Sequence, residues 1–413
     1  MKQMTKRSMM YVLVVLVVAL VAVGCGSTTT TTAPAASTTT AAPAGSTTTA
    51  APAGSTTTAA PTGGKIIVGC FTSLTGASAG AGSTIATGVK FAVKEWNDKG
   101  GINGQQIEVI VEDDQSTPTG AVNAFNKLVS QKPAFIVGPP FTGNVLAVEQ
   151  SLKTSGKLPV FTGATNVAIT QGGDGWFFRV GTVDSITSVL NAQFIIDDLK
   201  AKKPAIIYPN NDYGKGGYEG IKAYCDSKGI PLVAAETFTQ GTDKDVTAQL
   251  TKIKNAGADA LFCWTIPVDA AMVTLQSIQV GLKVPMLGKY ATPDYLKLVG
   301  DSSEGIYSFL DTSASLDEAT AAWTAAIKAF DPASNIAFST AEAYDATNMA
   351  LEQIAKGAAT ADALKAALSA LVDYKGICGP FTFGADHNGL HQGVIGQYKS
   401  QKFTILKTIT VAP

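Results

Sequence analysis

The sequence is poor in charge, in histidine and in paired cysteines. Charged residues make up 15% of the 413 residues, whereas about a quarter is usual in a globular chain. The only histidines are His387 and His391, and no two of the five cysteines have a C-x-x-C spacing. The formal net charge is −1, so the basic excess of a nucleic-acid binder is missing. We therefore expect no bound nucleic acid, metal or cofactor.

The amino terminus differs in composition from the rest of the chain. Residues 1–64 contain no Asp or Glu and three of the 31 basic residues, so residues 65–413 carry a net charge of −4. A basic start, Met1–Ser8, precedes 15 apolar residues, Met9–Val23. A membrane-spanning helix needs roughly 20 apolar residues, so this pattern predicts a secretory signal peptide over residues 1–24.

The signal ends in Ala22-Val23-Gly24-Cys25, which resembles a bacterial lipobox with Ala22 at the position of the usual Leu. The resemblance implies that Cys25 is lipidated and becomes the first residue of the mature chain. Two alternatives stay open, a plain secreted protein with an unmodified Cys25 and a retained single-span anchor. The segment 25–64 is rich in Thr, Ala, Pro, Ser and Gly, with a nine-residue repeat at 41–49 and 50–58. Such a composition predicts a flexible tether with an end-to-end distance of roughly 35 Å.

From Lys65 onward, short apolar runs alternate with helical patterns. The runs expected as strands are residues 66–71, 107–111, 134–137, 158–161, 205–208, 232–236, 260–264, 285–287 and 305–310. Strict alternation predicts an α/β fold with doubly wound parallel sheets. Nine or ten strands are many for one sheet, so we expect two lobes. The last segment, 381–410, is predicted to form strands with no helix between them.

Ligands of open α/β sheets bind beyond the carboxyl ends of the strands. That rule nominates six loops, which are rich in Gly, Ser, Thr, Asn and aromatic residues and poor in paired catalytic groups. They are residues 72–82, 138–144, 163–166, 209–217, 264–269 and 289–294.

Catalytic and metal-binding hypotheses find little support. Residues 76–80 match the G-x-S-x-G pattern of serine hydrolases around Ser78, with His387 and His391 later in the chain. The turn is too long for a nucleophile elbow, since glycines spread it over about ten residues. His387 and His391 have H-x-x-x-H spacing, but Asp386-His387-Asn388-Gly389 has turn composition, so the two rings would not share a helical face.

Cys70, Cys225, Cys263 and Cys378 allow three disulfide connectivities if the chain is exported. Cys70 and Cys263 lie in apolar strands, where a buried free thiol is the simpler expectation. Arg179 is the only arginine after the signal. We expect it in a buried structural pairing near the lobe junction, with a ligand contact as the alternative.

Several motifs in register resemble the bacterial periplasmic binding proteins of the branched-chain amino acid type, the solute receptors of ABC importers. They are Leu74-Thr75-Gly76, Asn97 to Gly104, Glu112-Asp113-Asp114, Ile136 to Pro139, Ala164-Thr165-Asn166, Asp212-Tyr213-Gly214, Gly241 to Asp245 and Gly379 to Phe383. The resemblance implies a type I periplasmic binding fold, in which two Rossmann-like lobes are joined by a three-segment hinge. The implied divisions are lobe 1 at 65–183 and 313–382, and lobe 2 at 184–312 and 383–413.

The same resemblance implies a non-enzymatic, exported and lipid-anchored monomer, located at the outer face of the cytoplasmic membrane or in the periplasm. Its partners would be a small-molecule ligand, the membrane through Cys25, and the permease of an ABC importer. The expected ligand is a branched-chain amino acid or a related small carboxylate. An amine-free or aromatic carboxylate receptor, a sensory binding module and, last, a serine hydrolase are the alternatives.

Residue roles follow loop by loop from the resemblance. Thr142 matches the position that binds the ligand carboxylate through its hydroxyl and amide. Ala164 and Thr165 match a second contact to the carboxylate and the ammonium. Tyr213 matches the aromatic lid of the second lobe, and Ser78 is counted as a ligand contact in the first loop.

The sequence departs from the family pattern at the position that would bind the ligand ammonium. The family's amino-acid binders pair it with a Glu, whereas Tyr290 stands at the aligned position here. A buried ammonium without a counter-charge costs several kcal/mol, so either Asp269 or Asp294 substitutes, or the ligand has no amine. Ala81 replaces a bulky aromatic, which leaves room for a larger ligand. Phe141, Trp264 and Tyr290 are then expected to stack on it, and a core position is an equal alternative for Trp264.

Overall fold

The computed structural model describes residues 64–316 and 318–411. The predicted signal peptide, the lipidation site Cys25 and the tether lie outside the described residues. In the part of the chain that is described, no helix combines the length and the apolar character needed to cross a membrane.

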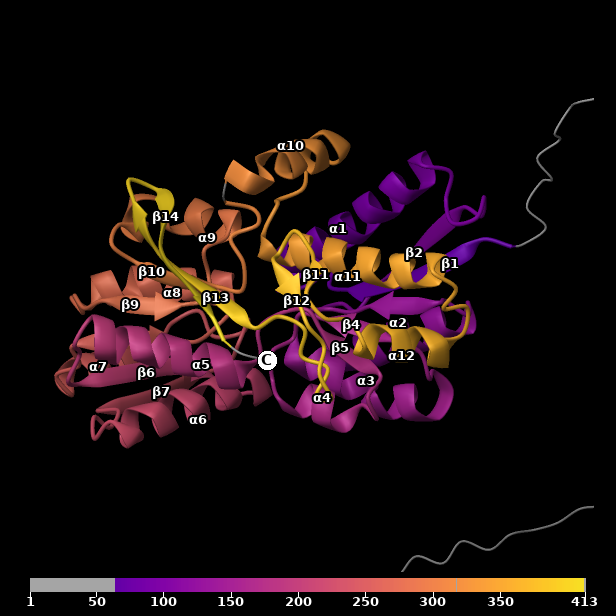
Figure 1. The fold of residues 1–413 in the computed structure, drawn as a ribbon. Helices are drawn as coiled ribbons and strands as arrows, with labels where there is room; N and C mark the ends of the chain where they lie inside the picture. The colour runs from indigo at the N-terminus through magenta and orange to yellow at the C-terminus, as the bar shows by residue number, and fades with distance from the viewer. Residues whose placement is uncertain (1–63, 317, 412–413) are drawn as a thin grey trace, which may run out of the picture. The chain divides into compact units, whose positions relative to one another are not determined.

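The first sheet has five parallel strands in the order β2-β1-β3-β4-β5. Its strands are β1 (Ile66–Thr72), β2 (Ile107–Asp113), β3 (Phe135–Val137), β4 (Val160–Thr162) and β5 (Phe177–Arg179). The helices associated with it are α1 (Ala79–Asp98), α2 (Pro118–Ser130), α3 (Thr142–Ser155), α4 (Ala168–Gly172), α10 (Ala321–Phe330), α11 (Phe338–Ala355) and α12 (Ala361–Ser369). We call this group of elements the first lobe (Figure 1).

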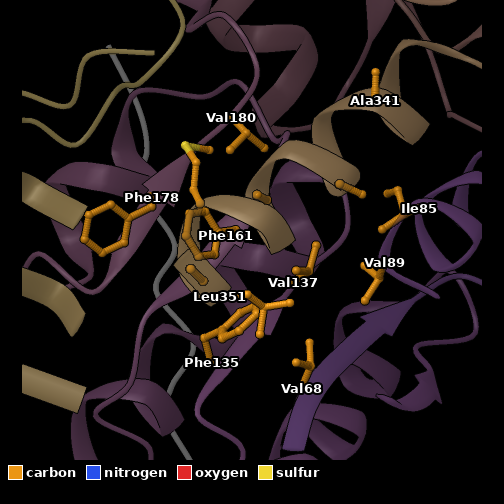
Figure 2. Packing of buried hydrophobic residues seen from close by; sticks show 14 of the residues in the cluster. Val68, Ile85, Val89, Phe135, Val137, Phe161, Phe178, Val180, Ala341 and Leu351 are labelled. Atoms are coloured by element: carbon orange, nitrogen blue, oxygen red, sulfur yellow. The ribbon is translucent and has the colours of Figure 1, made fainter. Parts of the chain in front are cut away.

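Helices cover both faces of the first sheet, which explains its near-continuous apolar strands. On one face, Phe135 and Phe161 pack with Val89 of α1 and Leu351 of α11 (Figure 2). On the other face, Phe71 meets Phe125 of α2 edge to face, with ring centroids 6.0 Å apart. Each strand therefore buries side chains on alternate faces in two separate cores.

The second sheet has seven strands in the order β14-β13-β10-β9-β8-β6-β7. Its strands are β6 (Pro204–Pro209), β7 (Ala234–Phe238), β8 (Ala260–Cys263), β9 (Met286–Gly288), β10 (Tyr307–Leu310), β13 (Gln392–Lys399) and β14 (Lys402–Thr410). Its helices are α5 (Asp184–Gln193) with a π-helical extension Phe194–Asp198, α6 (Asp212–Ser227), α7 (Thr247–Asn255), α8 (Pro267–Gln279) and α9 (Pro293–Val299). We call this group the second lobe. The neighbours from β7 to β10 pair in parallel, and β13 and β14 add antiparallel.

The remaining elements are short. They are the 3₁₀ turns Gly300–Ser303 and Glu318–Thr320 and the paired strands β11 (Tyr374–Lys375) and β12 (Pro380–Phe381). Predicted and observed strands agree in place and order, and the prediction of a type I periplasmic binding fold is confirmed. β5 was missed because Phe177–Arg179 is only three residues long and lies between a glycine-rich turn and a loop.

The chain passes between the lobes three times, after β5, after β10 and before β13. The crossings are tied together by side chains. The Thr182 hydroxyl donates to the carbonyl of Gln392 at 2.6 Å, and the Thr312 hydroxyl donates to the carbonyl of Cys378 at 2.9 Å. Phe383 and Leu390 pack in the core of the first sheet. We therefore propose Gln392, in place of residue 383, as the start of the last second-lobe segment.

Arg179 has the buried structural role that the sequence predicts. Its side chain is fully buried, and its Nε donates to Asn388 Oδ1 at 2.7 Å. One terminal nitrogen donates to the carbonyl of Asn166, also at 2.7 Å. The guanidinium thus joins the end of β5 to two loops of the first lobe.

All four described cysteines are buried and free of disulfides. Burial raises the pKa of the Cys70 thiol to about 12 and that of Cys225 to about 11. The expectation of buried free thiols is therefore confirmed for Cys70 and Cys263, and the thiols in these positions are held in the neutral form.

Gly217 provides a test of how the second lobe packs. It lies in α6, and a Cβ at this position would fall against the indole of Trp264. We expect Gly217→Ala to lower the free energy of unfolding by about 1–3 kcal/mol, since overpacked cores lose that much. Urea denaturation followed by circular dichroism measures it.

Gly143→Ala is the matched control. Gly143 also lies in a helix, but its nearest neighbour, a Pro118 carbon, is 4.0 Å from the added Cβ. This variant should be neutral or slightly stabilised, because Ala favours helices more than Gly does. Equal stability of the two variants would contradict the packing argument.

Candidate functional site

A cavity of about 350 Å³ lies between the two lobes, within one compact unit of the chain, Ala59–Pro413. All six loops nominated from the sequence contribute to its wall. Its size is within the range of small-molecule sites, about 300–1,000 Å³. The carboxyl ends of the parallel strands therefore converge on one pocket, as the topology rule predicts.

Four of the predicted site residues line this pocket. Ser78 and Thr142 come from the first lobe, as does Thr165, and Tyr213 comes from the second lobe. Phe141, expected as a stacking residue, and Ala81, expected to leave room, also line it. The structure thus brings these residues together, and their contacts to a ligand stay a prediction.

Three predicted residues lie behind the wall and not on it. Ala164 is fully buried in the core of the first lobe. Trp264 packs behind Tyr213, with ring centroids 5.7 Å apart, and Tyr290 packs on Tyr295 at 4.7 Å. Both aromatic rings pack in the second-lobe core, and neither lines the pocket where a stacked ligand would lie. The core alternative for Trp264 is the one observed.

Sequence reasoning missed some of the wall. Ser116 and Gln240 follow β2 and β7, so the same strand-end rule would have found them. Four residues around the start of α11 also line the pocket, namely Asn335, Ala337, Phe338 and Ser339. They follow no strand of either sheet, and no local signal in the sequence marks them.

The first-lobe wall is built around the start of α3. The helix begins at Thr142, directly after β3 and the turn Gly138-Pro139-Pro140-Phe141. The amide of Gly138 donates to the carbonyl of Phe161 at 2.7 Å, which fixes the turn to β4. The Thr142 hydroxyl is buried and has no partner. Free amides and the helix dipole make this end of the pocket suited to an anion.

The second-lobe wall is positioned by capped helices. Asn211 caps α6 by accepting from the amide of Gly214 at 2.9 Å, and Tyr213 follows it on the wall. Burial raises the pKa of Tyr213 well above its usual value, so its phenol stays protonated. Asn166 of the first lobe donates to the carbonyl of Asp212 at 2.8 Å, which joins the two lobes at the rim.

Lys289 is the only basic residue among those that line the pocket. Its ammonium forms an ion pair with the buried carboxylate of Asp311 and lies 5.0 Å from the ring centroid of Phe338. Burial, and next the charge of Asp311, raise the pKa of the nearby Glu342 carboxyl well above its usual value. We infer that Glu342 is protonated, so Lys289 and Asp311 neutralise each other.

Of the two acidic candidates to replace the family's Glu, only Asp294 lines the pocket. Its Oδ1 accepts from Asn335 Nδ2 at 2.7 Å, which is another contact between the lobes. Asp269 is buried beside the wall, and its carboxylate accepts from the amide of Gly241 at 3.1 Å. Asp269 is therefore placed to hold the loop at 241 and not to meet a ligand.

The two histidines are engaged away from the pocket. His387 stacks on Phe178 with ring centroids 4.4 Å apart, and its Nε2 lies 3.0 Å from the Ser369 hydroxyl. His391 Nε2 lies 2.8 Å from the carbonyl of Asn388. Neither ring lines the pocket that contains Ser78. The G-x-S-x-G serine therefore has no histidine base in this arrangement.

The chain belongs to the periplasmic binding protein family, whose model matches residues 65–402. It is 30% identical over 346 residues to the Leu/Ile/Val-binding protein BraC3 of Rhizobium johnstonii, covering 83% of this chain and 91% of that one. It is 30% identical over 242 residues to the Leu/Ile/Val-binding protein homolog 3 of Brucella melitensis, covering 58% of this chain and 66% of that one. The chain thus belongs to the same family as these two Leu/Ile/Val-binding relatives.

Solved structures agree with this assignment. The branched-chain amino acid transporter substrate binding protein LivJ from Streptococcus pneumoniae, in complex with isoleucine, aligns with a TM-score of 0.75. The alignment has 26% identity and covers 84% of this chain and 100% of that one. A solute binding protein from R. palustris in complex with benzoate aligns with a TM-score of 0.76 at 20% identity, covering 85% and 98%. The latter likeness concerns the fold alone.

A buried carboxyl beside the pocket should make stability depend on pH. Burial raises the pKa of Asp184 from 3.8 to about 6. The folded state then keeps a proton that the unfolded state has lost. The contribution of Asp184 to stability is therefore complete below pH 3.8 and is lost as pH rises through about 6.

We expect Asp184→Asn to abolish that loss, because an amide does not ionise. Relative to wild type, the variant should gain about 3 kcal/mol in unfolding free energy between pH 4 and pH 7, from a pKa difference of about two units. Urea denaturation across this pH range measures the difference. Parallel curves for the two proteins would show that the carboxyl titrates normally.

Proposed function

We propose that this protein is the extracytoplasmic receptor of an ABC importer and binds a branched-chain amino acid or a related small carboxylate. The observation that carries the proposal is the pocket between the lobes, with the start of α3 at Thr142 on its first-lobe wall. A helix start with an unpartnered hydroxyl suits a carboxylate. The names of the relatives point to the same ligand class.

Ligand binding would bring the two lobes together around the three crossings, in the manner of hinge closure. The closed form would then present both lobes to a membrane permease. Export through the signal peptide and anchoring through a lipid on Cys25 would keep the receptor at the membrane, as a monomer on the 25–64 tether. A sensory module with the same pocket is the rival role.

We further propose that the protein binds its ligand without transforming it. The Ser78 motif has no base at the pocket, since His387 and His391 are held by Ser369 and Asn388. The wall of the pocket otherwise carries hydroxyl, amide and apolar groups, the carboxylates of Asp212 and Asp294, and a neutralised Lys289. Such a set supports recognition and offers no activated nucleophile.

An amine-free or aromatic carboxylate is the second candidate ligand. Tyr290, at the position of the family's Glu, is fully buried and supplies no charge. The walls carry apolar side chains that suit an aliphatic or aromatic body, including Phe141, Ile266 and Phe338. The two candidates therefore differ in one feature, the ligand ammonium.

A thermal-shift screen would separate these ligand classes. We expect L-leucine, L-isoleucine or L-valine to raise the melting temperature at millimolar concentration, because a ligand that binds only the folded state stabilises it. Benzoate, 4-hydroxybenzoate and 4-methylpentanoate form the amine-free arm. If the acids without an amine shift the transition and the aliphatic amino acids do not, the amino-acid assignment is wrong.

Asp294 is the residue that we expect to pair with an ammonium. Asp294→Asn should weaken L-leucine binding at least about tenfold, since a hydrogen bond to a charged group contributes roughly 1.5–3 kcal/mol. Binding of 4-methylpentanoate, which lacks the ammonium, should not weaken. Isothermal titration calorimetry measures both affinities.

Asp212→Asn is the matched control, because Asp212 is the other acidic residue lining the pocket and is exposed at the start of α6. It should change L-leucine affinity less than threefold. An unchanged affinity in Asp294→Asn would mean that Asp294 serves only as a contact between the lobes through Asn335.

A further inference from the structure

Many of the polar side chains lining the pocket already have partners in the protein. This holds for hydroxyl, amide and charged groups on both walls. The pairs are Thr84 with the Ala81 carbonyl, Ser116 with the Thr75 carbonyl, Asn144 with Asp114, Thr292 with the Tyr295 amide, Lys289 with Asp311 and Asp294 with Asn335. These groups have their hydrogen bonds without a ligand.

Two lining hydroxyls are exceptions. Thr142 on the first-lobe wall is 2% exposed, and Thr265 on the second-lobe wall is 0% exposed. The Oγ1 atom of each is buried and has no hydrogen-bond partner. A buried hydroxyl left without a partner is unfavourable. The two unpartnered hydroxyls therefore indicate positions where a bound molecule would supply hydrogen bonds.

The backbone around Thr265 holds it in this position. The amide of Trp264 donates to the carbonyl of Ile207 at 3.0 Å, which extends the pairing of β8 by one residue. The Trp264 ring is held by Tyr213 and by the close approach of Gly217. Thr265 follows, and α8 begins two residues later at Pro267. The hydroxyl is thus placed by the strand end and not by a free loop.

We propose that the Thr265 hydroxyl is a second-lobe contact of the charged head group of the ligand. This inference rests on the proposed function. A hydroxyl donates one hydrogen bond and accepts two, so it suits either a carboxylate or an ammonium. A ligand bonded to Thr142 on one wall and Thr265 on the other binds the closed form better than the open form, which shifts the lobes toward closure.

The test compares Thr265→Val and Thr265→Ser with wild type. L-leucine and benzoate are titrated by calorimetry, and the unbound proteins are denatured with urea. Thr265→Val keeps the shape and removes the hydroxyl, and we expect its affinity to fall about 10- to 100-fold. Its unbound stability should not fall, because the hydroxyl has no partner to lose. Thr265→Ser should stay within about threefold of wild-type affinity.

Thr274→Val is the matched control in the same lobe. The Thr274 hydroxyl is buried in α8 but is bonded to the Ala270 carbonyl at 2.8 Å and to the Tyr295 hydroxyl at 3.0 Å. It does not line the pocket. This variant should lose stability and keep its affinity, which is the reverse of the pattern expected for Thr265→Val.

The outcomes separate the inference from the function on which it rests. Weaker binding of both probes by Thr265→Val assigns the hydroxyl to the carboxylate, and weaker binding of L-leucine alone assigns it to the ammonium. If wild type binds a probe and Thr265→Val binds it within threefold, the inference is overturned while the proposed function stands. A loss of stability like that of Thr274→Val also overturns it. If wild type binds neither probe, the proposed function fails and the inference fails with it.

Discussion

The pocket depends on how the three crossings between the lobes are bonded to one another. They are joined by neutral hydrogen bonds, from Thr182 to Gln392 and from Thr312 to Cys378. Such bonds need short, fixed side chains and lose little when salt or pH changes. Because both sheets end in loops that face the same pocket, a fixed junction is enough to bring those loops together.

The buried cations near the junction are held by partners within the protein. Lys289 pairs with Asp311, and Arg179 is bonded to Asn388 and Asn166. Burial lowers the pKa of Arg179 to about 10, which leaves it protonated at neutral pH. Removing either Lys289 or Asp311 would leave the other charge uncompensated in a buried setting, which is costly. The buried charges of this chain therefore act inside the fold, and the pocket wall keeps the carboxylates of Asp212 and Asp294 beside its hydroxyl and amide groups.

The sequence predicts the fold well because its signals are periodic and local. Apolar runs such as Ile66–Thr72 predict strands buried on both faces, and the six loops predicted from the strand ends all contribute to the pocket wall. The direction of individual side chains is not predicted by these local signals. Trp264 and Tyr290 were expected on the wall, but their rings fill the second-lobe core. The side of a loop that faces the pocket is set by packing with distant residues such as Gly217 and Tyr295. A local sequence pattern does not contain this information.

The same dependence on distant packing explains why the sequence pointed to Trp264 as a ligand contact and gave no role to its neighbour Thr265. An aromatic residue at a strand end suggests stacking, yet the larger ring gains most by burial in the core. Its burial fixes the backbone, and the next residue, Thr265, lies among the residues that line the pocket. A small hydroxyl in that position costs little space and can bond either to a carboxylate or to an ammonium. Thr142 and Thr265 would then share the recognition of a charged head group with Asp294, and the apolar walls would select for the shape of the rest of the ligand.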